Sequence, residues 1–583
     1  MVGGIVQPAL VALASIAIGA HYTGLYTLPT RSAVPLHAQR EPDTERLSCR
    51  PFLPKLFVDS PPAADNAHIA AAARTLDAHF TARVAHGDID ALSVAVVTSA
   101  GPVFEKNYGV INGNATSDRR PLHSHAQYRV ASVSKLILVL EAWILQERGV
   151  LSWEDPVEKY IPGFTYRAGA FSPKALHEDA NAGDAPITLA QLAAHTSGLG
   201  RDWPTGIVKN WPHDLFGSGP PPTNGHAFPS DEALYNAIAS TRLLSPPNAL
   251  PAYSNTGTGL LGLVLLAANK AAAKNVKGEP ATYAELVQRD IFAPLGMNGS
   301  HFLATEGNKD FIVTPSLHPE IADQDFLGAM NPAGGQFSSL ADLVKLTRSL
   351  LNPHDKKQRL LTPYSMDRWL KPVYAFEEDD WTFLGLIWEI VKHRDSNDRL
   401  RHIYWKLGAM ASYHSALALH PGSSYGVVIL LAGHYPDAAR LAYDAFDVMQ
   451  PAFDAALADS ATELYAGKWT GNVHGNETDR AIISVEKGTL YLEELVLEGT
   501  NVLKTFFAPG RLALRSTERR DELRIDAGIP GYNGHVHMGC YPYIQDLWGM
   551  KNDVPTNLIY FTGDEDGKRS LHVPAAGVVL TRA

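Results

Sequence analysis

Apolar and polar residues alternate with different periods in different parts of the chain. A long apolar run extends from Leu136 to Leu145 and is broken only by Glu141. Such a run predicts a helix buried on nearly every side, and Gly149 is a stop signal that ends it. Other runs with apolar positions at helical spacing predict further helices over residues 63–85, 187–195, 256–274, 283–292, 338–351 and 437–449.

Shorter apolar or alternating runs predict strands near both ends of this segment. Residues 92–98 and 103–108 flank Ser99-Ala100-Gly101-Pro102, which is typical of a hairpin turn. Later strands are predicted at residues 384–391, 413–420 and 425–431. Because strands flank a helical middle, we expect an α+β domain over residues 63–453 whose sheet is built from both ends of the segment.

After about residue 454 the pattern changes again. Short alternating runs are separated there by Gly, Asn and Asp. They predict a separate, small antiparallel β domain over residues 454–583, for which a barrel is one arrangement. Its strands are expected at residues 482–485, 490–497, 512–514, 558–562 and 578–581.

The N-terminal segment is apolar and uncharged as far as Arg31. Residues 1–25 are therefore predicted to be a secretory signal peptide or a short membrane anchor, although a positive n-region is missing. Either role makes the protein secreted or membrane-tethered, in an extracellular or lumenal compartment. Residues 26–62 are rich in proline and polar groups and are expected to be a leader that lies over the surface.

Sequons and cysteines bear on the same question. Three N-x-S/T triplets begin at Asn114, Asn298 and Asn476, and they would carry glycans if the chain is secreted in a eukaryote. The only cysteines are Cys49 and Cys540, which could form a disulfide or stay as two thiols.

Composition and charge narrow the function classes. The chain has 583 residues, a length that indicates more than one domain. Of these residues, 45% are hydrophobic and 19% are charged, which is typical of globular proteins. A formal net charge of −11 argues against binding to a nucleic-acid backbone. Nucleic acid is therefore not an expected partner, and no phosphate-loop or dinucleotide motif is present.

Ser132 and Lys135 stand at the head of the apolar run from Leu136 to Leu145. Residues three apart lie on one face of a helix, so the lysine would sit beside the serine in a dry environment. Burial favours the neutral form of a lysine, which could then activate the serine hydroxyl as a nucleophile. Serine before an apolar run is also an ordinary helix cap, but a capping box has Glu or Gln at the third position, and a cation there opposes the helix dipole.

Two later motifs supply candidate partners. Tyr253-Ser254-Asn255 precedes a predicted helix, and a tyrosine near cations can transfer protons. Lys406-Leu407-Gly408 precedes the strand at Tyr413, where a glycine lets a substrate lie against a strand edge. Taken alone, Tyr253 could simply pack, Asn255 could cap its helix, and Lys406 could be an exposed lysine.

The ordered set Ser132-x-x-Lys135, Tyr253-x-Asn255 and Lys406-x-Gly408 resembles the three motifs of class C β-lactamases and related serine hydrolases. That group includes penicillin-binding-protein-like peptidases, family VIII esterases and fungal acyltransferases. The surrounding sequence agrees from about residue 65 to 450, including His195-Thr196-Ser197-Gly198-Leu199. The resemblance implies a β-lactamase/transpeptidase-like fold, with an antiparallel sheet flanked by helices and an all-helical subdomain.

The resemblance also implies a role for each matching residue. Ser132 would be the nucleophile, with Lys135 and Tyr253 sharing proton transfer. Asn255 would position the substrate and Lys135. Lys406 and Gly408 would bind the substrate, and the backbone N–H groups of Ser132 and Ala409 would form the oxyanion hole where the third motif runs along an edge strand.

Leu407 departs from the antibiotic-hydrolysing members, which have a hydroxyl residue there that binds the carboxylate of the drug. The expected function is therefore a serine hydrolase that cleaves an ester, amide or thioester of a small-molecule acyl substrate, rather than a true β-lactamase. An acyltransferase with the same site, in secondary metabolism for example, and a catalytically silent binding protein are the alternatives. No cofactor is expected.

Several histidines and one irregular stretch are further candidates for a functional role. His195 is expected to be structural. His535, His537 and Cys540 are expected to be ordinary core or surface residues, so no metal site is predicted. The irregular stretch that contains Trp203, Trp211 and residues 216–229 is expected to be a lid or substrate wall.

Overall fold

The computed structural model divides the chain into two units, each described here by itself. One unit comprises residues 55–457, and the other comprises residues 458–583 together with the segment that ends at Pro54. The structure describes residues 50–115, 119–169, 186–202, 208, 210–213, 227–274, 277–471, 479–505, 510–526, 540, 546, 548–564 and 567–583. The predicted signal or anchor segment and most of the predicted leader lie outside these residues.

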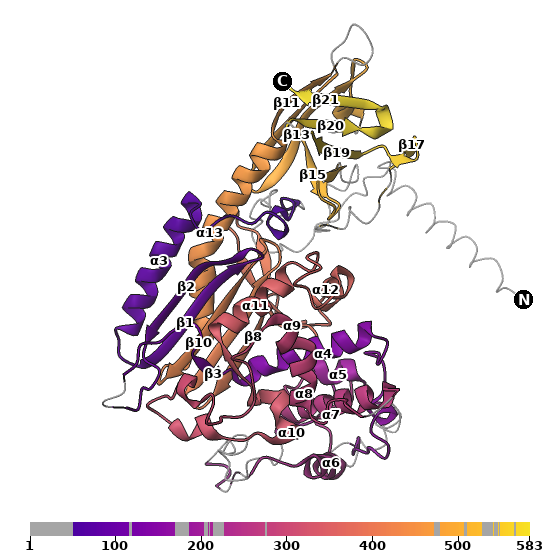
Figure 1. The fold of residues 1–583 in the computed structure, drawn as a ribbon. Coiled ribbons are helices and arrows are strands. Elements are labelled where there is room, and N and C mark those ends of the chain that lie inside the picture. The colour runs from indigo at the N-terminus through magenta and orange to yellow at the C-terminus, as the bar shows by residue number, and fades with distance from the viewer. Residues whose placement is uncertain are drawn as a thin grey trace, which may run out of the picture. The chain divides into compact units, whose positions relative to one another are not determined.

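The larger unit contains an eight-stranded antiparallel sheet in the order β2-β1-β10-β9-β8-β7-β6-β5 (Figure 1). The predicted hairpin is confirmed as β1 (Ile89–Thr98) and β2 (Gly101–Gly109). β1 pairs along its length with β10 (Tyr425–Gly433), in a register that runs from Ile89 opposite Gly433 to Thr98 opposite Tyr425. The sheet is therefore built from both ends of the segment, as the sequence predicts.

The late strands differ in part from the prediction. β9 (Tyr413–His420) has the predicted bounds. The predicted strand over 384–391 is wrong as a single element, because it is divided between β6 (Thr382–Leu384) and β7 (Glu389–Arg394). β8 (Leu400–Met410) was not predicted, because its polar residues interrupt the apolar pattern that indicates a buried strand. Neighbouring strands pair with both of its edges along part of its length. β5 (Tyr374–Ala375) ends the sheet.

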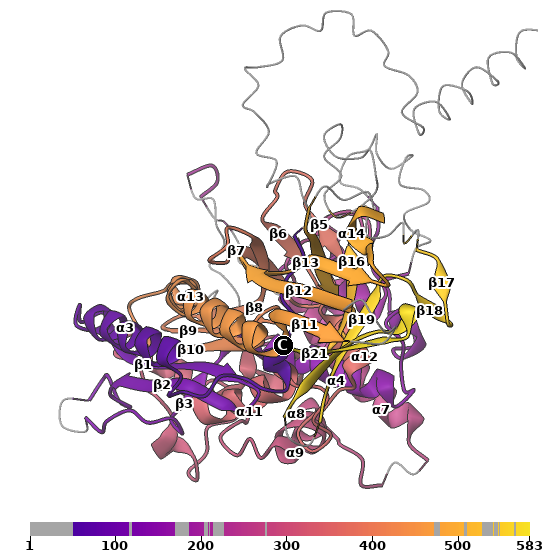
Figure 2. The ribbon, with the colours of Figure 1, turned by 90° about the horizontal axis from the view of Figure 1, so that it is seen from above.

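Helices cover the two faces of this sheet (Figure 2). On one face, α3 (Ala67–Val84) packs Phe80 against Phe104 and Tyr108 of β2, with ring centroids 6.5 and 6.4 Å apart. On the other face, Val428 and Leu430 join the main apolar core with residues of α11 (Leu340–Leu351). Neighbouring residues of β10 point to opposite faces of the sheet. Because both faces are buried, β10 is apolar along its whole length.

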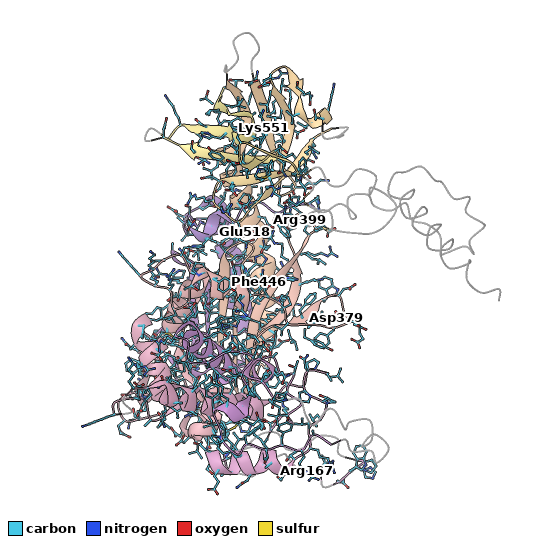
Figure 3. The ribbon with its side chains drawn as sticks, turned by 90° about the vertical axis from the view of Figure 1, so that its right-hand side faces the viewer. Arg167, Asp379, Arg399, Phe446, Glu518 and Lys551 are labelled. Atoms are coloured by element: carbon cyan, nitrogen blue, oxygen red, sulfur yellow. The ribbon has the colours of Figure 1, made fainter. Side chains whose placement is uncertain are left out.

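α13 (Ala438–Tyr465) continues well past the predicted end at residue 449 and through Pro451. Proline inside a helix costs free energy, but here apolar side chains on both sides of Pro451 are buried against the sheet. Phe446, which Figure 3 labels, lies 5.5 Å from the ring of Tyr425, and Phe453 stacks on Tyr425 at 4.0 Å. Burial of these rings explains why the helix continues.

The helical part of the larger unit forms around the long apolar helix. α4 (Ser134–Glu147) is buried from Ser134 to Leu145 and shares one apolar core with α7 (Asn255–Ala272). α5 (Leu189–Ala193) begins with a capping box between Thr188 and Gln191. The other helices of this unit are α6 (Asp231–Ser240), α8 (Tyr283–Val287), α9 (Ala293–Leu295), α10 (Leu327–Met330) and α12 (Pro363–Trp369).

The smaller unit is an antiparallel β domain, as predicted. Its strands follow the order β12-β11-β21-β20-β19-β16-β15-β13-β14, and an additional pairing between β12 (Asp479–Glu486) and β13 (Thr489–Leu497) closes them into a ring. Closure removes the exposed strand edges, which confirms the barrel as the arrangement. The other strands of this sheet are β11 (Gly467–Gly471), β14 (Thr500–Asn501), β15 (Leu512–Ser516), β16 (Glu522–Asp526), β19 (Leu558–Gly563), β20 (Arg569–Val573) and β21 (Val578–Arg582).

Two features bear on the expectations for the N-terminal segment. Within the described ranges, no helix is both long and apolar enough to span a bilayer. Cys540 takes part in a disulfide, and Cys49, the other cysteine of the chain, lies outside the described residues.

Candidate active site

Ser132 lies on a short 3-10 turn, η2 (Ala131–Val133), that leads directly into α4. Every residue from Ala126 to Leu145 is buried except Ser132, which is half-buried. Ala131 has a φ of 47°, an uncommon backbone conformation for a residue with a side chain. Such strain is characteristic of functional sites, and here it sets the start of the turn that presents the Ser132 hydroxyl.

Lys135 and Tyr253 both contact the Ser132 hydroxyl. The Nζ of Lys135 lies 2.9 Å from Ser132 Oγ, and the Tyr253 hydroxyl lies 2.7 Å from the same atom. Lys135 Nζ also donates to the carbonyl of Ala333. The fold therefore brings together three residues that are up to 121 positions apart in the sequence.

Burial and charge change the proton affinities of this group. Burial lowers the pKa of Lys135, because its ammonium has lost its water. Burial also raises the pKa of Tyr253, but the positive charges of Lys135 and Lys406 outweigh this effect and lower it to about 8. The Nζ atoms of these lysines each lie 5.1 Å from the centroid of the phenol ring. Lys135 and Tyr253 therefore both release a proton more readily than usual.

His195 packs against the tyrosine and does not contact Ser132 in the described structure. Its ring centroid lies 4.4 Å from that of Tyr253, and its Nδ1 accepts a hydrogen bond of 3.2 Å from the Ser254 N–H. Burial, reinforced by the charge of Lys135, holds the pKa of His195 well below its usual range. A neutral imidazole that supports the tyrosine ring agrees with the structural role expected for it.

Asn255 and Ser254 differ from what the sequence suggests. Ser254 caps α7, since its hydroxyl accepts a 2.8 Å hydrogen bond from the Gly257 N–H. The amide of Asn255 donates to Asp202 Oδ1 at 2.6 Å, whereas the contacts described for Lys135 Nζ are Ser132 and the Ala333 carbonyl. Asp202 therefore holds the amide nitrogen of Asn255, and a role of Asn255 in positioning Lys135 stays a prediction.

The third motif lies on a part of β8 with one open edge. β7 pairs with residues 400–405 of β8, whereas β9 pairs with residues 404–410. In the described part of the sheet, Leu407, Gly408 and Ala409 therefore pair on one side only, so the motif is at an edge although β8 as a whole is an interior strand. Ala409 is exposed there, which leaves room for the predicted substrate contact.

Gly408 lets β8 approach the nucleophile. A Cβ atom at this position would lie 2.3 Å from the Val130 carbonyl oxygen, 2.4 Å from Ser415 Oγ and 3.1 Å from the Ser132 nitrogen. A side chain would therefore push the strand away from η2. The third motif is close to Ser132 because this residue is glycine.

Lys406 is 1% exposed and pairs with Glu389, whose side chain is 27% exposed. Glu389 Oε1 lies 2.5 Å from Lys406 Nζ, and its Oε2 accepts a 3.2 Å hydrogen bond from the Leu407 N–H. Although burial alone would lower the pKa of Lys406, the carboxylate of Glu389 and, to a smaller extent, Tyr253 outweigh it and raise this pKa. Lys406 is therefore held as a cation.

Sequence reasoning missed Glu389 and Asp202. Glu389 had a signal, since it is a carboxylate inside the apolar run Leu386-Ile387-Trp388-Glu389-Ile390-Val391. Asp202 had none, because an aspartate in a loop is ordinary. The predicted lid lies largely outside the described residues, as do Trp203, His535 and His537, and the described Trp211 is 70% exposed.

Known proteins resemble this chain over most of the larger unit. A model of the family described as Beta-lactamase matches residues 76–450. The Beta-lactamase-like protein str6 from Strobilurus tenacellus is 36% identical over 319 residues, which are 52% of this chain and 99% of the relative. The D-alanyl-D-alanine-carboxypeptidase/endopeptidase AmpH from Escherichia coli (strain K12) is 24% identical over 311 residues, or 52% of this chain and 70% of AmpH.

One solved structure supports the fold. The structure of a beta-lactamase/D-alanine carboxypeptidase from Yersinia pestis complexed with citrate has a TM-score of 0.50 and 20% sequence identity. It covers 66% of this chain and 99% of the Yersinia chain. The predicted β-lactamase/transpeptidase-like fold is thereby confirmed.

Proposed function

The chain belongs to the beta-lactamase family, whose members are serine hydrolases, and on that basis we propose that it cleaves an ester, amide or thioester through an acyl-Ser132 intermediate. The observation that carries this proposal is the contact of Ser132 Oγ with both Lys135 Nζ and the Tyr253 hydroxyl. A serine hydroxyl becomes a nucleophile when an adjacent base takes its proton. Lys135 and Tyr253 are both placed for this, and both have lowered pKa values.

In the acylation step, Ser132 Oγ attacks the carbonyl carbon of the substrate while its proton passes to whichever of Lys135 and Tyr253 is deprotonated. The carbonyl π electrons move to the oxygen, and the N–H groups of Ser132 and Ala409 are proposed to stabilise the resulting oxyanion. When the tetrahedral intermediate collapses, the bond to the leaving group breaks. The departing alcohol, amine or thiol takes up the proton that Ser132 gave to the Lys135–Tyr253 pair, which returns the pair to its starting state.

Deacylation repeats these proton transfers with water as the nucleophile. Water gives its proton to the same pair of residues, its oxygen attacks the acyl carbon, and the ester bond to Ser132 breaks. Ser132 Oγ recovers a proton, and a carboxylic acid leaves. If an alcohol or amine took the place of water, the same site would act as an acyltransferase.

The test is labelling with a fluorophosphonate and with an activated ester, read by intact mass. We expect one adduct on the wild type and none on Ser132→Ala. Ser134→Ala is the matched control, because it removes the neighbouring hydroxyl of the same segment and should keep the adduct if circular dichroism shows a folded protein. An unlabelled wild type, or an adduct that persists in Ser132→Ala, would contradict the proposal.

Added acyl acceptors separate the two kinds of acyl transfer. Faster release of the leaving group with an added alcohol or amine, together with a transfer product, identifies an acyltransferase. A rate that does not depend on the acceptor, with free acid as the product, identifies a hydrolase.

We also propose that residues 1–25 direct the protein to a secretory path or tether it to a membrane. Support comes from the uncharged apolar segment and from the sequon residues Asn114 and Asn298, whose side chains are exposed. Native material should lose mass on treatment with a glycosidase. An unchanged mass would count against secretion through a glycosylating compartment.

A further inference from the structure

β7 and β8 separate at the point where β8 approaches the nucleophile. Glu389 is the first residue of β7 and pairs with Trp405, and beyond this pair the edge of β8 is open in the described structure. The Glu389 side chain extends over this edge to the next two residues of β8. It binds the Lys406 ammonium through Oε1 and the Leu407 N–H through Oε2.

These two donors are what an anionic group of a substrate would use. An ammonium and a free strand-edge N–H together suit a carboxylate, because each of its oxygens can accept one hydrogen bond. In this chain both donors are already used by a carboxylate of the protein itself. An incoming substrate carboxylate would have to displace Glu389 or lie beside it, and two like charges in that position repel each other.

The pairing of Lys406 with Glu389 supports the same conclusion. Lys406 and Glu389 sum to no net charge, so the third motif offers little attraction to an anion. Leu407, which is half-buried, has no hydroxyl that could accept or donate a further hydrogen bond. The end of the strand is also apolar, because Met410 packs against Phe228, Phe326 and Met330.

We propose that Glu389 determines specificity by occupying the position of a substrate carboxylate, so that the site selects uncharged, apolar acyl donors. Glu389 affects which substrates the site accepts and takes no part in breaking the scissile bond. The Glu389 carboxylate excludes substrates that carry a carboxylate at this position, because the two like charges repel each other and compete for the same donors. This inference depends on the proposed acyl transfer at Ser132.

The test compares thioesters in matched pairs. In each pair one compound carries a carboxylate and the other its carboxamide, which has nearly the same shape without the charge. The group is on the leaving thiol in one pair and on the acyl chain in the other, since either side of the scissile bond could face Lys406. The release of thiol gives kcat/KM for each compound with the purified full-length protein.

We expect the wild type to prefer the carboxamide in at least one pair by roughly tenfold or more. Glu389→Gln should reduce that preference by about tenfold or reverse it, because Lys406 would then be free to attract the carboxylate. Glu389→Asp keeps the charge and should keep the preference. Glu154→Gln is the matched control, since it removes one carboxylate from an exposed position and should leave the ratio unchanged.

The outcomes separate this inference from the proposed function. A wild type without preference in both pairs, or a preference that Glu389→Gln leaves unchanged, overturns the role of Glu389. If Glu389→Gln does not fold, the wild-type ratio and Glu389→Asp still decide the matter. A protein that turns over no thioester and forms no adduct on Ser132 overturns the acyl-transfer function itself.

Discussion

Lys135 and Lys406 are both fully buried beside Tyr253, yet their surroundings move their pKa values in opposite directions. Lys135 contacts a hydroxyl and a backbone carbonyl, and burial lowers its pKa. Lys406 has a carboxylate partner in Glu389, which outweighs the effect of burial and raises its pKa. A buried lysine with a counter-ion stays a cation, whereas one without a counter-ion becomes a candidate base.

The two lysines are therefore expected to have different roles in the site. Lys135 is suited to exchange a proton with Ser132, and Lys406 is suited to supply a fixed charge that makes the tyrosine more acidic. The following predictions separate these two roles, from the largest expected effect to the smallest.

Lys135→Met should have the largest effect, lowering kcat/KM about 10²–10⁴-fold, since it removes a proton acceptor that contacts the nucleophile. Lys406→Met is the same substitution at the other buried lysine and should cost roughly tenfold, because it removes a charge but no group that contacts Ser132. The measurement is hydrolysis of a neutral thioester. Equal losses of kcat/KM in the two variants would contradict the assignment of different roles to Lys135 and Lys406.

Tyr253→Phe should lower kcat/KM by about 10²-fold, because it removes the hydroxyl that lies 2.7 Å from Ser132 Oγ but keeps the aromatic ring. His195 would still have its aromatic neighbour, so circular dichroism should not change. The same thioester assay measures the loss. Wild-type rates in this variant would leave Lys135 as the only proton acceptor.

The pH profile should show the influence of the fixed charge. With the pKa of Tyr253 lowered to about 8, kcat/KM should rise with pH and level off above that value, as the deprotonated form of the Lys135–Tyr253 pair accumulates. Lys406→Met removes a charge that lowers this pKa, so the rise should move to higher pH. Glu389→Gln removes a charge that raises it, so the rise should move to lower pH. Shifts in the same direction in both variants would contradict this account.

Glu389→Gln should have the smallest effect on the turnover of a neutral thioester, and it should also lower the stability of the fold. It leaves the Lys406 ammonium, which is 1% exposed, without its counter-ion, at a cost of about 1–3 kcal/mol. Urea unfolding of the two single variants and the double variant gives the coupling between them. The double variant with Lys406→Met should recover much of the loss, and additive losses would show that the pair does not act as a unit.

Much of the fold followed from local patterns. The apolar run after Ser132, the hairpin of β1 and β2, and β9 all formed where periodicity predicts them, because burial imposes that periodicity on helices and strands. The elements that were missed or misjudged are those whose form depends on a distant neighbour. β8 is a strand because β7 and β9 pair with it, and α13 continues past Pro451 because β10 covers its rings.

In the candidate site, too, the sequence determines some features and the tertiary structure decides others. The sequence by itself determined the residue types and their order, since Ser132-x-x-Lys135, Tyr253-x-Asn255 and Lys406-x-Gly408 can be read directly. It also determined that Lys135 would be buried beside Ser132, because both belong to one short helical segment. Only the tertiary structure decided the direction in which the pKa of each lysine moves, the acidity of Tyr253 and the partner of the Asn255 amide. These depend on Glu389, Asp202 and an open strand edge, which lie far away in the sequence and only a few ångströms away in space.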